Sequence, residues 1–246
     1  MLRTFLLLLA FVAAAPNGEQ EYNAAVAAVS SGNVEASLGH FEAALQADPD
    51  NLRYGNDYRQ AVIREKAYDR SIAFFEKLVA DHPDAANAFL NFGFAYVDKI
   101  PDSGAITQVL NANTALTYFT KSIELKPTWI GYYTRGNSYL FWPKIFNRTQ
   151  LGIDDLKVAL KMMHEQGPKL GVYVRTYVAL GDGYWKMDDP EQARKLWQQG
   201  LEEFPDSEAL KKRLAATEQE LGSIVSVSYD PNVRVNTDLS ELWTKQ

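Results

Sequence analysis

The side chains of this chain that could carry out acid–base or metal chemistry are few and scattered. Its three histidines, His40, His82 and His164, lie far apart in the sequence, and none has the His-x3-His spacing or the carboxylate cluster of a metal site. The chain contains no cysteine, which excludes thiolate catalysis, disulfide bonds and cysteine-ligated metals. We therefore expect no catalytic residue, no metal and no cofactor.

Other motifs that can carry chemistry have a structural explanation here. Asp188 and Asp189 precede Pro190, where a carboxylate caps the start of a helix. The Gly-Asp-Gly sequence at 181–183 lies in a helical pattern rather than a phosphate loop, and no G-x-S-x-G nucleophile elbow occurs. A formal net charge of −6 without any basic run argues against a nucleic-acid partner. The functional surface must therefore be sought in the architecture.

A pattern of large, small and proline residues runs through the range 177–205. Its members are Tyr177, Leu180, Gly181, Tyr184, Ala193, Trp197 and Pro205. The pattern resembles the tetratricopeptide repeat (TPR), a helix-turn-helix unit of about 34 residues that reads W-x2-L-G-x2-Y, then A-x3-F, then P. Gly181 and Ala193 are small where two helices would cross, and Pro205 prevents the second helix from continuing.

The same pattern recurs along most of the chain. Pro83 follows Pro49 by 34 positions, which is one TPR period. Gly93 and Gly136, each followed by a tyrosine three positions later, mark two further units. The resemblance covers roughly residues 21–221, although the first helices of the first two units depart from the pattern. It implies an all-α, right-handed α-solenoid of about five TPR units.

The N-terminus has the pattern of an export signal over residues 1–14. Arg3 supplies a positive charge, and the apolar run Phe5–Val12 leads into three alanines, with cleavage expected after Ala14. An uncleaved membrane anchor is the alternative, but the run is shorter than the roughly 20 residues that a span needs. We expect a periplasmic or secreted protein with no membrane span after signal removal.

The remainder divides into a solenoid over 15–222 and a C-terminal tail over 223–246. A charged amphipathic helix predicted over 207–221 would cap the solenoid. Within the tail, the β-branched residues of 224–229 predict an extended segment, and 237–243 predicts a short capped helix.

The TPR resemblance implies that the first helices of the units line a concave groove. The groove-facing positions of the three clearest units are Asn87, Leu90, Phe94 and Val97, then Ile130, Tyr133, Asn137 and Leu140, then Arg175, Val178, Asp182 and Trp185. From these we expect the following residues to bind an extended or helical peptide: Asn87, Phe94, Tyr133, Asn137, Arg175, Asp182 and Trp185. The alternative is that a segment of this protein fills the groove and that the aromatic residues are core.

Units three and four carry longer connections between their helices than the fifth unit does. The first, within 98–113, has ten extra residues, and the second, within 141–148, has four. Both are apolar where loops are usually polar, and within-repeat turns lie along one edge of a TPR stack. We therefore expect the two segments to meet and Trp142 and Phe146 to contact a partner. The alternative is that they pack on each other and only cover the edge.

Together these features indicate a secreted or periplasmic TPR scaffold or adaptor that binds a protein or peptide partner, in a cell-envelope assembly, without catalysis. The rival hypothesis is an envelope enzyme or small-ligand-binding protein that uses the groove as a pocket.

Overall fold

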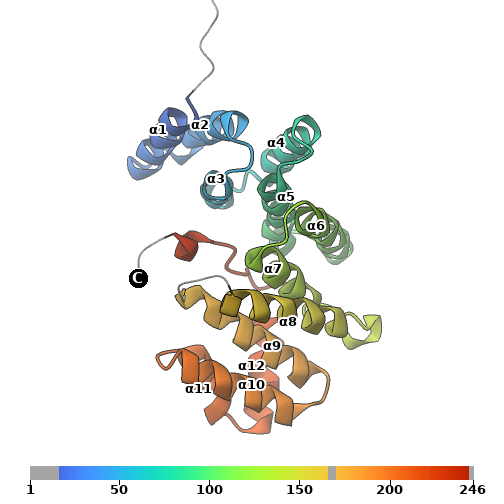
Figure 1. Ribbon diagram of the computed structural model, residues 1–246. Helices are drawn as coiled ribbons and strands as arrows, with labels where there is room; N and C mark the ends of the chain where they lie inside the picture. The colour runs from blue at the N-terminus through green and yellow to red at the C-terminus, as the bar shows by residue number, and fades with distance from the viewer. Residues whose placement is uncertain (1–16, 166–169, 244–246) are drawn as a thin grey trace, which may run out of the picture.

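The computed structural model describes residues 17–165 and 170–243, so the expected signal peptide lies outside the described residues. All regular elements of the described part are helical (Figure 1). The α-helices are α1 (Gly18–Ser30), α2 (Val34–Ala47), α3 (Leu52–Glu65), α4 (Tyr68–Asp81), α5 (Ala86–Lys99), α6 (Ala105–Leu125), α7 (Trp129–Tyr139), α8 (Thr149–Glu165), α9 (Val174–Lys186), α10 (Pro190–Glu203), α11 (Glu208–Ala215) and α12 (Glu218–Ser228). Short 3-10 turns are η1 (Ile100–Asp102), η2 (Lys144–Phe146), η3 (Gly171–Tyr173) and η4 (Ser240–Leu242).

Consecutive helices pack against each other, and the resulting pairs stack. The main pairs are α1 with α2, α5 with α6, α7 with α8 and α9 with α10, while α2–α3, α4–α5 and α8–α9 contacts join neighbouring units. Figure 1 shows the units following one another along a curved array. The predicted all-α solenoid is confirmed.

Small residues allow the paired helices to approach closely. A Cβ atom added to Gly181 would lie 2.1 Å from Nε1 of Trp197, and one added to Gly93 would lie 2.4 Å from Cε1 of Phe119. In both units a glycine of the first helix faces a fully buried aromatic ring of the second. The repeat pattern at these positions therefore reports real packing.

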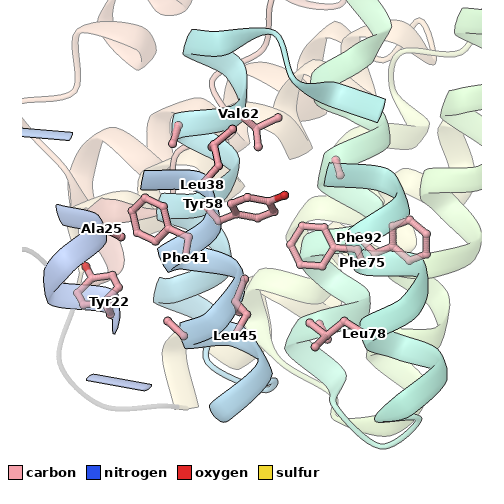
Figure 2. Close-up of a cluster of buried hydrophobic side chains, with 14 of the residues drawn as sticks. Tyr22, Ala25, Leu38, Phe41, Leu45, Tyr58, Val62, Phe75, Leu78 and Phe92 are labelled. Carbon is pink, nitrogen blue, oxygen red and sulfur yellow. The ribbon is translucent and has the colours of Figure 1, made fainter. Parts of the chain in front are cut away.

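Aromatic side chains carry the core from one unit to the next. Figure 2 shows Phe41, Tyr58, Phe75 and Phe92 in one buried cluster built from α2 to α5. Ring centroids are 6.5 Å apart for Phe41–Tyr58, 5.7 Å for Tyr58–Phe75 and 6.2 Å for Phe75–Phe92. Tyr58 stands where the repeat expects leucine, and its hydroxyl donates a 2.7 Å hydrogen bond to Glu42, so the departure is accommodated.

The C-terminal region differs from its prediction. The helix expected over 207–221 is broken at Ala216, and Thr217 caps a new helix, α12, through a capping box with Glu220. This helix continues through 224–228, so the prediction of an extended segment there was wrong. Val225 is buried on one face of α12, and this tertiary contact overrides the weak strand propensity of the β-branched residues. In 237–243 only the 3-10 turn η4 forms.

The ten extra residues of unit three do not form a loop. The turn η1 follows α5 directly, and α6 then begins at Ala105 and runs for 21 residues, compared with 14 in α2, α4 and α10. The insertion therefore extends a helix, and its apolar side chains project from a rigid element.

Candidate functional site

The concave side of the array is occupied by the protein's own tail. Residues 229–239 follow α12 and run along the first helices towards α3, as the red segment of Figure 1 shows. The backbone amide of Leu239 donates to Asn56 in α3 (2.8 Å), and the Thr237 carbonyl accepts from Nη2 of Arg59 (3.1 Å). The Thr237 hydroxyl also donates to Asp98 in α5 (2.5 Å). Beside α3 and α5 the structure therefore shows the alternative, in which a segment of this chain fills the groove.

Arg59 is the residue that fastens the tail. Its side chain is fully buried, with Nη1 2.9 Å from Asp98 and Nε 3.0 Å from Asn91. The guanidinium also lies 4.5 Å from the ring centroid of Phe94. Phe94 is consequently buried under Arg59, and the structure leaves it no open groove surface for a partner. Arg59 was missed as a functional residue, and the available signal was an arginine where the repeat has glycine.

Carboxylates also hold the tail on its outer side. Arg234 pairs with Asp102, which accepts a 3.0 Å hydrogen bond from Tyr68 as well. The Tyr68 hydrogen bond and the Arg234 charge lower the pKa of Asp102. Burial alone would raise the pKa of Asp238, but hydrogen bonds from the η4 backbone and from Asn56 lower it. Both groups thus favour the docked tail in their charged form.

Asp182 was expected to bind a partner, but the structure places it in the interior. It is fully buried and accepts two hydrogen bonds from Arg213, from Nε at 2.6 Å and from Nη2 at 2.7 Å. The Tyr229 hydroxyl donates a third at 3.2 Å. Burial alone would lower the pKa of Arg213, but the hydrogen bonds and charge of Asp182 raise it. Asp182 therefore ties α9 to α11 and to the start of the tail.

The other expected groove residues divide into two sets. Asn87 binds the α2–α3 connection, with its amide 2.6 Å from the Asp50 carboxylate, and Arg175 pairs with Glu241 of η4 at 2.6 Å. Tyr133, Asn137 and Trp185 are half-buried and line an open cavity, together with Arg175. The seven predicted residues are therefore not brought together into one open groove.

The cavity has a volume of about 990 Å³ and lies where the tail leaves the concave surface uncovered. Its walls come from α5, η1, the first half of α6, α7, residues 141–146, the end of α9, α12 and the tail. This volume is at the upper end of the range of small-molecule sites. Most of its lining side chains are apolar, so an apolar group would be favoured inside.

The two insertions meet beside this cavity, as predicted. Nη1 of Arg148 donates to Asn113 at 2.9 Å, and both segments contribute to the cavity wall. Trp142 is 6% exposed, lies 3.7 Å beneath the Arg148 guanidinium and makes an edge contact with Phe146. Trp142 is thus part of the packed support, whereas Phe146 is 53% exposed.

Large apolar side chains are exposed on α6 and η2, two elements that border the cavity. We call this surface the apolar lip; it consists of Ile106, Val109, Leu110, Ile145 and Phe146. Ile106 and Ile145 are 81% and 83% exposed, which is unusual for two isoleucines on elements that border one cavity. The sequence showed these residues as apolar insertions but not that they stay uncovered.

The part of the chain that the structure describes contains no group of three or more His, Asp or Glu side chains placed to hold a metal ion. Within the same residues, no helix combines the length and the apolar character that crossing a membrane requires.

Comparison with known proteins identifies the repeats. Family models described as tetratricopeptide repeat match residues 22–88 and 174–217. A thermophilic TPR protein of Thermus thermophilus is similar over 81% of this chain and 97% of its own, with TM-score 0.57 and 18% identity. A tetratricopeptide repeat protein from Parabacteroides merdae covers 85% of this chain and 76% of its own, with TM-score 0.57 and 12% identity. MamA from Desulfovibrio magneticus covers 79% and 100%, with TM-score 0.54 and 18% identity.

At these identities the solved structures show a shared fold and no more. The family matches, the glycine–aromatic helix pairs and the stacked helical units agree with one another. Residues 22–88 and 174–217 of this chain are tetratricopeptide repeats, and the chain shares the helical-solenoid fold of TPR proteins.

Proposed function

We propose that this protein is an exported, non-catalytic TPR adaptor whose apolar lip binds an apolar segment of a protein partner in the cell envelope. TPR proteins are generally scaffolds for protein–protein contacts, which supports the class of function. The observation that carries the proposed site is the exposure of the lip beside a concave surface that the tail already fills.

The lip has the properties of an interface anchor rather than of a loosely packed edge. Ile106, Val109 and Leu110 lie on one face of α6, at spacings of three and four residues. On the second side of the lip, Lys144 in η2 forms an exposed ion pair of 2.6 Å with Asp188, in the turn between α9 and α10. An apolar surface presented by a regular helix such as α6 costs little ordering entropy when a partner binds.

The partner fitted best by this surface is an apolar helix or extended segment that lays its side chains between the two sides of the lip. In protein interfaces a small number of anchor residues accounts for most of the binding energy. Val109 and Phe146 also line the cavity mouth, so a large side chain of the partner could insert there.

Export is supported by the N-terminal sequence alone, with Arg3, the apolar run Phe5–Val12 and the alanines that follow. Mass spectrometry of the protein purified from the envelope of its native host should find an N-terminus near Ala15. A mature protein that retains Met1, or that stays in the cytoplasm, would contradict export.

Site-specific photo-crosslinking in the native host tests the lip directly. A photoreactive amino acid at Ile145 should give a defined covalent adduct with one envelope protein. The matched control is Val158, which is 38% exposed on α8 and does not line the cavity, and it should give no such adduct. The same adducts from both positions, or none from Ile145, would contradict the proposed site.

A further inference from the structure

One residue that lines the cavity has a buried polar atom without a hydrogen-bond partner in the described part of the chain. Thr134 of α7 is 5% exposed, and its Oγ1 atom is buried without a hydrogen-bond partner among the described residues. Thr134 also lines the cavity, as does Asn137 one turn further along α7. A buried hydroxyl without a partner is costly, and a ligand oxygen in the cavity would remove that cost.

Lys186 supplies a positive charge to the same cavity. Its amine donates to the carbonyl oxygen of Leu140 and lies 5.1 Å from the centre of the Tyr229 ring. Burial lowers the pKa of this amine, although the charge of Asp182 acts in the opposite direction. Within residues 17–165 and 170–243 no carboxylate forms an ion pair with Lys186.

The other cations that line the cavity are already paired. Three pairs account for them: Lys144 with Asp188, Arg175 with Glu241, and Arg234 with Asp102. Lys186 is therefore the lining cation of the described chain that has room for an added anion. A single amine also selects for a single negative charge, because a phosphate group is usually held by several donors.

The remaining wall is apolar and surrounds the cavity from several helices. It includes Val97, Ile100, Phe141, Trp142 and Val225. These side chains would bury a flexible hydrocarbon chain, and each methylene moved from water into such a wall contributes about 0.8 kcal/mol.

We propose that this cavity binds one long-chain fatty acid, or another single-chain amphiphile with a carboxylate head. The carboxylate pairs with Lys186 and accepts hydrogen bonds from Thr134 and Asn137, while the hydrocarbon chain lies along the apolar wall towards the lip. The proposal goes beyond the protein-binding function, because it assigns a separate small-molecule ligand to the interior of the cavity.

Fluorescence titration of the purified, delipidated protein with cis-parinarate, followed by displacement with palmitate, tests this proposal. Binding should saturate at one fatty acid per chain. Lys186→Met should weaken palmitate binding by about tenfold or more, which is the value of a charge-assisted contact in a sheltered site. The matched control Lys195→Met, on the exposed surface of α10, should leave the affinity unchanged.

The head group provides a second, independent comparison. Hexadecanol has the same chain as palmitate without the charge, so it should bind more weakly to the wild-type protein and about equally to wild type and Lys186→Met. Ser226→Trp places a large ring at the cavity wall from an exposed position on α12 and should block both ligands.

Absence of saturable binding would overturn the proposal, as would equal palmitate affinity of the wild type and a folded Lys186→Met. If Lys186→Met does not fold, palmitate binding that persists in folded Ser226→Trp overturns it instead. None of these outcomes bears on the lip, since crosslinking at Ile145 detects a protein partner and not a lipid.

Discussion

Replacing Asp182 with asparagine separates an interior role from a binding role at this position. The substitution keeps the shape of the side chain but removes the charge that two Arg213 hydrogen bonds and one from Tyr229 contact. The guanidinium would then be buried without a counter-charge, a change that costs about 3–5 kcal/mol. For a chain of this length we expect the thermal midpoint Tm to fall by roughly 6–20 °C.

Thermal unfolding followed by circular dichroism measures this effect, with Asp188→Asn as the control. Asp188 forms an exposed ion pair with Lys144, so its replacement should change the stability by less than about 1 kcal/mol. A triple variant, Asp182→Leu with Arg213→Met and Tyr229→Phe, removes all the polar groups and should be more stable than Asp182→Asn. Asp182→Asn with an unchanged Tm and lost partner binding would refute the interior role.

Three further predictions follow from the packing and from the tail. Gly181→Ala should destabilise the protein by about 1–3 kcal/mol in urea unfolding, because the new Cβ overlaps the buried ring of Trp197. Gly222→Ala in α12 should stabilise it by about 0.5–1 kcal/mol, because a Cβ there would have no atom within 4 Å. Similar effects of the two substitutions would contradict the close approach at Gly181. Trp142→Ala should cost about 3–5 kcal/mol of stability, as a buried support does, and an unchanged unfolding curve would show that this residue is a surface contact. The pKa values of Asp102 and Asp238 are lowered in the docked state, so docking of the tail is fully stabilised above a pH of about 3.8 and weakens as the pH falls through the lower docked values. The rate of hydrogen exchange over 234–241, corrected for the intrinsic pH dependence of exchange, should therefore rise at low pH. A corrected rate that does not change with pH would contradict this.

The repeat architecture could be predicted because its signals are local and periodic. Gly93 and Gly181 recur at fixed distances from aromatic residues, and each reports the close contact of one helix pair. The meeting of the two insertions also followed from the periodicity, because within-repeat turns lie along one edge. These features depend on spacing within a unit and not on distant parts of the chain.

The site could be predicted only in part, because what covers the concave surface comes from another part of the chain. The phase of the helices correctly places Asp182 and Phe94 on the inner side, but the occupant is the tail, held by Arg59. The β-branched residues of 224–228 favour a strand locally, and the packing of Val225 against the solenoid favours the helix α12 instead. Local pattern carries no information on either contact.

The central claim is that the partner binds at the lip rather than in the groove that the tail fills. It is tested most directly by comparing the affinity of the crosslinked partner for the wild type and for a Phe146 variant. By isothermal titration with the purified partner, Phe146→Ala should weaken binding by roughly 30-fold, the loss of one anchor of about 2 kcal/mol, with an unchanged Tm. Val158→Ala, on the exposed face of α8, should bind as the wild type does. Wild-type affinity in Phe146→Ala, together with tighter binding by a chain truncated after Tyr229, would contradict the account and place the partner in the groove.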